Sequence, residues 1–102
     1  MAEKGYTIYL EGGFRIVVTV RLAQGRVVGF IVRLVDESQD SVKDLARYDT
    51  AHGWPHLDIL NEQGQLKVKS WSKAASFDQA FQEAIEDFKK NHETYAFKRK
   101  DG

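Results

Sequence analysis

The sequence predicts an α+β domain: a twisted antiparallel sheet of five or six strands in meander order, followed by one C-terminal amphipathic helix packed on one face. Two patterns indicate this class. The first two-thirds of the chain alternate apolar and polar residues with period two, which is typical of half-buried strands. The last third carries apolar residues at helical spacing, which is typical of a helix that buries one side.

Short turns that contain glycine separate the expected strands. The strongest alternation lies between Phe14 and Leu22, where apolar residues, most of them β-branched, occupy every second position. Turn signals stand at 23–25 and 62–64. Gly29 lies inside an alternating segment, where it indicates a bulge or a close approach to the backbone. The expected strands cover residues 6–10, 14–22, 26–35, 45–49, 56–61 and 65–71.

The expected helix starts after Ser76, because Ser76 and Gln79 have the spacing of a capping box. It is expected to end near Asn91 or His92. A helix with this apolar stripe needs a sheet to dock on, since burying each large side chain contributes roughly 1.5–3 kcal/mol. The stripe consists of Phe77, Ala80, Phe81, Ala84, Ile85 and Phe88.

Length and composition fit one small domain, because 102 residues do not provide a second core. We expect residues 1–97 to form that domain and 98–102 to be a basic, disordered tail. The absence of cysteine excludes disulfides and cysteine zinc sites. No apolar run approaches the roughly 20 residues of a membrane span. Because the N-terminal residues also lack the hydrophobic region of a signal peptide, the sequence predicts a cytoplasmic protein.

The charges balance, with 15 basic and 15 acidic residues. This counts against broad, charge-driven binding of nucleic acid, but a local basic patch is compatible with it. Five arginines of the expected strands form either a basic stripe on one sheet face or a solvated outer face. They are Arg15, Arg21, Arg26, Arg33 and Arg47.

One polar segment, residues 47–58, concentrates groups that can carry chemistry. His56 and Asp58 are two apart on an expected strand, so their side chains point to the same face. Burying them there is costly unless they are paired. Lys67, Lys69 and Trp54 are candidate binding residues near this segment, although a large aromatic can equally complete a small core. The candidate catalytic residues are Arg47, Asp49, His52, His56 and Asp58.

Three interpretations of this segment stay open. His52, His56 and an aspartate could bind a divalent metal. A histidine could instead act as general acid or base with an aspartate fixing its tautomer, while Arg47 and a lysine stabilise phosphate charge. The third interpretation is structural: Asp49 and the other polar side chains cap the loop by hydrogen bonds to its backbone.

The segment Arg-Tyr-Asp-Thr-Ala-His-Gly at 47–53, followed by Pro-His-x-Asp at 55–58, resembles the signature of a family of small prokaryotic domains of unknown function. Gly64, Lys69 and Trp71 fall in corresponding places. More distantly, the Arg-Tyr-Asp core followed by histidines is similar to TumE-type toxins of toxin–antitoxin pairs. The resemblance implies that the signature residues are functional.

The sequence therefore leads to two hypotheses. In the first, the protein is a toxin-like ribonuclease that acts on RNA without a cofactor through the candidate catalytic residues. In the second, it is a non-catalytic module that binds another protein, as an accessory or inhibitory partner. An edge strand could pair with such a partner or form a homodimer. Neither hypothesis involves a membrane.

Overall fold

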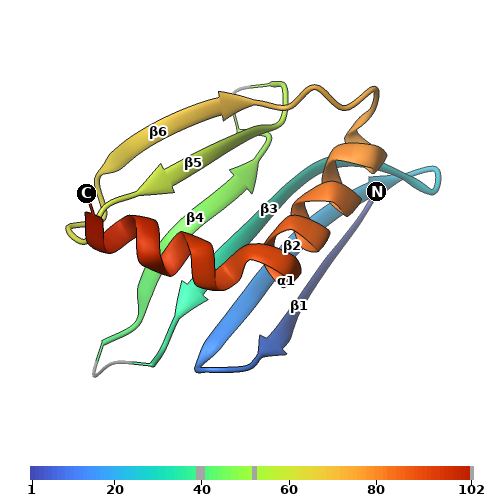
Figure 1. Ribbon diagram of the computed structural model, residues 1–102. Helices are drawn as coiled ribbons and strands as arrows, with labels where there is room; N and C mark the ends of the chain where they lie inside the picture. Colours follow the sequence, from blue (N-terminus) through green and yellow to red (C-terminus); the bar gives the residue numbers. More distant parts are fainter. Residues whose placement is uncertain (39–40, 52, 102) are drawn as a thin grey trace.

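The computed structural model describes residues 1–38, 41–51 and 53–101. Within them the chain forms one six-stranded antiparallel sheet and one helix, and the strand order follows the sequence order (Figure 1). The expected α+β meander is therefore confirmed. No helix in this part of the chain is long and apolar enough to cross a membrane. The elements are β1 (Ala2–Leu10), β2 (Phe14–Ala23), β3 (Arg26–Asp36), β4 (Lys43–Asp49), β5 (His56–Leu60), β6 (Leu66–Trp71) and α1 (Phe77–Asp101).

The first strand is longer than the sequence predicts. We expected it to begin at Tyr6, but β1 begins at Ala2. Its register with β2 pairs Ala2 with Leu22 and continues without a break to the turn. The polar residues at its start show no apolar alternation, because β1 is an edge strand and these residues are exposed. Cross-strand hydrogen bonds therefore determine where β1 begins, and the hydropathy pattern does not reveal them.

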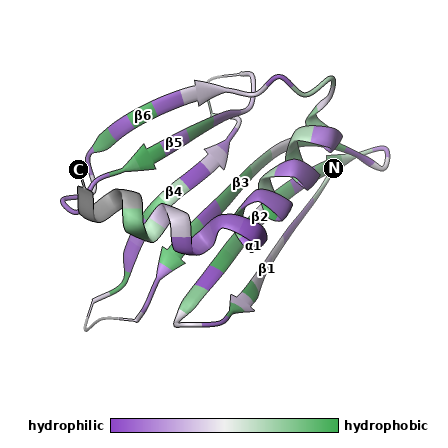
Figure 2. Ribbon diagram, viewed as in Figure 1, coloured by the Kyte–Doolittle hydropathy of each residue, from purple (hydrophilic) through white to green (hydrophobic). Residues whose placement is uncertain are grey.

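The two faces of the sheet differ. The helix face is covered by α1 and holds the core, and Figure 2 shows the matching alternation of hydrophobic and hydrophilic residues along β2 and β3. The core consists mainly of Ile16, Val18, Val20, Phe30, Val32, Leu34, Leu45, Ala46, Ala80, Ala84, Phe88 and Tyr95. The opposite face of the sheet, called the open face, carries the strand residues that alternate with the core residues along each strand. Its central residues are Thr19, Arg21, Ile31, Arg33, Arg47, Asp49, His56, Asp58, Lys69 and Trp71.

The helix begins as the sequence predicts. Ser76 Oγ accepts a hydrogen bond from the Gln79 amide at 3.1 Å, and the Gln79 side chain accepts one from the Ala75 amide at 3.1 Å. The second contact reaches one residue further back than in an ideal capping box. At its other end α1 includes the backbone of 98–101. The domain boundary at residue 97 and the disordered tail stay predictions.

A kink lies at the predicted helix end. Asn91 has non-helical backbone angles (φ −119°, ψ 15°), so the first helical segment ends where the sequence predicts, but a second segment that the sequence does not predict continues α1 beyond it. Tyr95 lies past the kink and is 8% exposed. Its hydroxyl and that of Tyr48 both donate to Asp87. This anchor joins the second segment of the helix to the sheet, and hydropathy spacing does not reveal it.

Candidate functional site

Neighbouring strands bring the predicted polar residues together. The register of β4 and β5 pairs Asp49 with His56 and Arg47 with Asp58. All four belong to the open face, since the residues between them along each strand contact the core. The prediction that His56 and Asp58 share one face is therefore confirmed.

Asp49, His56 and Asp58 form one group of side chains, called here the Asp–His–Asp cluster. Nε2 of His56 lies 3.3 Å from Oδ1 of Asp49 and 3.4 Å from Oδ2 of Asp58. Nε of Arg47 lies 3.3 Å from Oδ2 of Asp49 and 3.4 Å from Oδ2 of Asp58. Each carboxylate therefore faces both the imidazole and the guanidinium.

The cluster is buried, although no helix covers it. The exposed fractions are 1% for His56, 6% for Asp49 and 4% for Asp58. Trp71 is the cross-strand neighbour of His56 in β6, and the two ring centroids lie 5.2 Å apart. The two neighbours of the cluster reach solvent: 45% of the Arg47 side chain is exposed, and Trp71 is 54% exposed. Two buried carboxylates need compensation, and both lie beside the Arg47 guanidinium and the His56 ring.

Backbone groups orient two of the three cluster side chains. Nδ1 of His56 lies 3.3 Å from the carbonyl oxygen of Trp54. Oδ1 of Asp49 accepts a hydrogen bond from the Ala51 amide at 3.0 Å. Oδ1 of Asp58, in contrast, is buried and has no hydrogen-bond partner among the described residues. The structural interpretation thus accounts for Asp49 and leaves one carboxylate oxygen unexplained.

This geometry restricts the chemistry that the cluster can perform. Three acceptor atoms converge, which suits a proton or a metal ion held between them. A general acid or base must reach the proton that it transfers. Because Trp71 packs on the buried ring of His56, an acid–base role for His56 requires Trp71 to move.

The remaining candidate residues lie at different distances from the cluster. His52 lies outside the described residues. Lys69 is the cross-strand neighbour of Asp58, and its Nζ stands 5.8 Å from the ring centroid of Trp71. Lys67 is exposed on the same strand. Both lysines therefore lie on the strand that flanks the cluster.

Trp54 holds the loop before β5. Its Nε1 donates to the carbonyl oxygen of Ser72 at 2.9 Å, and its ring meets Phe77 edge-on with centroids 5.4 Å apart. Because Phe77 opens α1, this contact ties the loop to the start of the helix. Trp54 remains 40% exposed, so its predicted binding role stays a prediction.

Some of the arginines named in the sequence analysis form ion pairs, and Arg47 is half exposed. Arg15, Arg21, Arg33 and Arg47 share the open face. Arg15 pairs with Glu37 at 2.7 Å and Arg33 with Asp44 at 2.7 Å. The open face thus carries several cations, and carboxylates neutralise some of them.

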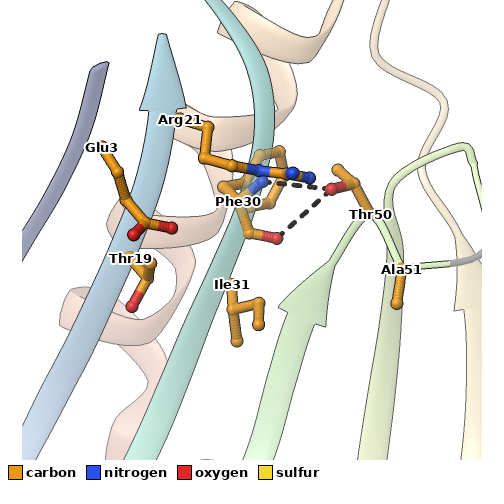
Figure 3. Close-up of a pocket in the computed structure, with 7 residues that line it drawn as sticks. All are labelled: Glu3, Thr19, Arg21, Phe30, Ile31, Thr50 and Ala51. Carbon is orange, nitrogen blue, oxygen red and sulfur yellow. Dashed lines mark hydrogen bonds between the residues drawn. The ribbon is translucent and has the colours of Figure 1, made fainter. Parts of the chain in front are cut away.

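A pocket of about 240 Å³ adjoins the cluster at the end of β4, and sequence reasoning missed it. Figure 3 shows the Arg21 side chain crossing β3 toward Thr50, whose hydroxyl accepts a hydrogen bond from the Phe30 amide. Arg21 occupies the space over Gly29, where an added Cβ would lie 2.5 Å from Nη2. The predicted close approach at Gly29 is confirmed, and it places Arg21 in the lining of the pocket.

A second polar group lies on the helix face, behind the cluster. Asp87 accepts hydrogen bonds from Tyr48 at 2.6 Å, Tyr95 at 2.5 Å and Asn91 at 2.7 Å. Burial, and then the hydrogen bond to Asp87, raise the pKa of Tyr48 and of Tyr95 well above the usual value. Both hydroxyls therefore stay protonated at neutral pH.

Comparison with known proteins yields a single result. A family model, described as a domain of unknown function, DUF7718, matches residues 1–102. No curated protein and no solved structure matches the chain. The match spans the whole sheet, the helix and the Asp–His–Asp cluster. The chain belongs to the DUF7718 family of domains of unknown function.

Proposed function

We propose that this protein is a ribonuclease that resembles bacterial toxins of this class and works on RNA at the open face. The observation that carries the proposal is the position of Arg47. Its guanidinium is half exposed and stands directly over the buried Asp–His–Asp cluster. A cation held rigidly by buried carboxylates is suited to stabilise the charge that develops on a phosphate.

The strand beside the cluster supports RNA as the substrate. Lys69 is exposed and adjoins the ring of Trp71, which is itself 54% exposed. An exposed aromatic ring with a neighbouring cation provides a stacking surface for a base and a contact for its phosphate. In this proposal Arg47 and Lys69 hold the phosphodiester, Lys67 extends the contact, and Trp71 stacks on a base.

The pocket beside the cluster offers a further cation. Arg21 lies across β3, and the hydroxyl of Thr19 lines the same pocket. Arg21 on β2, Arg33 on β3, Arg47 on β4 and Lys69 on β6 thus distribute cations across the open face. Single-stranded RNA is extended and flexible enough to reach such dispersed cations, whereas base-paired RNA is recognised mainly by shape.

The test is cleavage of a labelled single-stranded RNA by the purified protein. Arg47→Gln should lower the cleavage rate about 100-fold, the usual effect of losing one charge-stabilising group. Lys69→Gln should weaken RNA binding and reduce its dependence on salt. The matched control is Lys90→Gln, which removes an exposed cation from α1 and should leave both unchanged.

Two results would contradict this proposal. One is a wild-type protein that leaves RNA intact both with and without added divalent cations. The other is equal activity of Arg47→Gln and Lys90→Gln, because a nonspecific charge effect or a contaminating nuclease would not distinguish the two positions.

One observation favours the second candidate function, a protein-interaction module. All six residues of β6 are exposed, and β6 lies at the edge of the sheet. Such an edge can accept an additional strand, and a second copy of this chain is the simplest donor. Sedimentation over a range of concentrations should then show a dimer, and the amides of β6 should exchange more slowly at high concentration. A monomer at every concentration would contradict this candidate.

A further inference from the structure

Three potential ligand atoms converge in the Asp–His–Asp cluster. Each residue offers one atom, and these atoms all lie within 4.8 Å of one another. They come from the paired ends of β4 and β5, so the sheet fixes their positions. All three side chains are more than nine-tenths buried. Buried histidine and carboxylate groups in this arrangement are the usual ligands of a divalent cation.

The distances fit ligands of one ion better than direct hydrogen bonds. A charge-assisted bond between an imidazolium and a carboxylate is about 2.7–2.9 Å long. Nε2 of His56 lies 3.3 and 3.4 Å from the two carboxylate oxygens. In a tetrahedral zinc site with bonds of about 2.0–2.1 Å, neighbouring ligand atoms are about 3.3–3.4 Å apart. The cluster has the spacing of two edges of such a tetrahedron.

The orientation of His56 agrees with this interpretation. Its Nδ1 faces the carbonyl oxygen of Trp54, which can only accept, so Nδ1 carries a hydrogen. Metal-binding histidines commonly donate their second ring N–H to a backbone carbonyl in this way. Nε2 of His56 is then directed at Asp49 and Asp58, where a cation would lie between them.

Asp58 supplies an independent observation. Its Oδ1 is buried and has no hydrogen-bond partner among the described residues, and its side chain is 5% exposed. A buried carboxylate oxygen without a donor is costly. The oxygen that faces His56 is Oδ2, so a cation bound there would neutralise the negative charge that the Asp58 carboxylate shares between Oδ2 and the unpartnered Oδ1.

We propose that Asp49, His56 and Asp58 bind one Zn²⁺ ion. Three protein ligands leave a fourth position for water or substrate, as in catalytic zinc sites. Two carboxylates and the Arg47 guanidinium carry one net negative charge, and Zn²⁺ reverses it to one positive charge. The loaded site would therefore attract a phosphate. Zinc binding is independent of the proposed ribonuclease function, because it is measured without RNA.

The experiment uses the full chain, treated with a chelator and then titrated with Zn²⁺ against a chromophoric chelator. We expect one equivalent per chain. Asp58→Asn keeps the shape of the side chain and should weaken Zn²⁺ binding by more than the roughly 10–100-fold that loss of a second-shell group costs. His92→Gln is the matched control, since His92 lies on α1 away from the cluster, and it should bind like the wild type.

A second measurement needs no variant. Co²⁺ added in place of Zn²⁺ should give the intense visible absorption of a tetrahedral site, and Zn²⁺ should abolish it. The proposal is overturned by the absence of a one-to-one complex, by an octahedral Co²⁺ spectrum, or by Asp58→Asn binding as tightly as His92→Gln. If zinc binds but RNA stays intact, only the ribonuclease function fails.

Discussion

Two polar groups lie on opposite sides of β4, one partly buried beneath α1 and one buried on the open face, and their hydrogen bonds differ. On the helix face, Asp87 receives hydroxyl and amide donors at 2.5–2.7 Å. On the open face, the Asp–His–Asp cluster has contacts of 3.3–3.4 Å and one oxygen without a donor. The first group is satisfied within the fold. The second group is held in place but unsatisfied, as expected of residues retained for binding a ligand.

The largest expected effect concerns the satisfied group. Asp87→Ala removes the acceptor of two partly buried hydroxyls and of Asn91, so the free energy of unfolding should fall by about 2–4 kcal/mol. Urea denaturation measures this change. Glu86→Ala, at an exposed neighbouring position of α1, is the control and should change the stability little. If both variants unfold alike, the Asp87 group does not stabilise the fold.

The same group predicts a loss of stability at alkaline pH. Because folding raises the pKa of Tyr48 and Tyr95, their contribution is complete below the unfolded value of about 10 and is lost as the pH rises above it. The loss should be roughly 1.4 kcal/mol per pH unit for each tyrosine. Unfolding measured between pH 9 and about 11 should show a weaker pH dependence in Tyr95→Phe. An unchanged slope in that variant would exclude Tyr95 as a cause.

A smaller effect concerns the cover of the cluster. Trp71→Ala should lower the free energy of unfolding by about 1 kcal/mol, since the side chain is already half exposed. It should also expose His56, so that diethyl pyrocarbonate modifies this ring faster, as mass spectrometry of the peptide would show. Val68→Ala truncates an exposed residue of the same strand and serves as the control. Equal modification rates would show that Trp71 does not cover His56.

The smallest expected effect sharpens the contrast between the two groups. In metal-free protein, Asp58→Asn should change the free energy of unfolding by less than about 1 kcal/mol, because the amide oxygen can still accept from Arg47, the substitution removes a like charge beside Asp49, and Oδ1 of Asp58 has no hydrogen bond to lose. Urea denaturation in the presence of a chelator measures it. A loss as large as that of Asp87→Ala would mean that Asp58 serves the fold.

The sequence predicts most of the fold because local rules determine it. Alternation identifies β2 and β3, glycine marks the turns, and Ser76 with Gln79 marks the start of α1. The start of β1 and the helical segment beyond Asn91 escape prediction, since pairing with β2 holds the first and the contact of Tyr95 with Asp87 holds the second. Those contacts join residues far apart in the sequence.

The candidate site is predictable only in part. Spacing alone placed His56 and Asp58 on one face, and the signature segment included Arg47 and Asp49. The covering ring of Trp71 is not predictable in this way, because it depends on the register between β5 and β6, which contains an irregularity. The pocket at Arg21 likewise depends on a side chain that crosses a neighbouring strand.

The most direct test of the contrast is the free energy of unfolding with and without saturating Zn²⁺, compared among three proteins. Zinc should stabilise the wild type and Tyr95→Phe by the same amount, about 2.7 kcal/mol at a zinc concentration 100 times the dissociation constant. At the same zinc concentration it should stabilise Asp58→Asn by less than about 0.4 kcal/mol, the value for a 100-fold weaker site. Equal stabilisation of all three proteins, or of none, would contradict the assignment of the Asp–His–Asp cluster as a cation site.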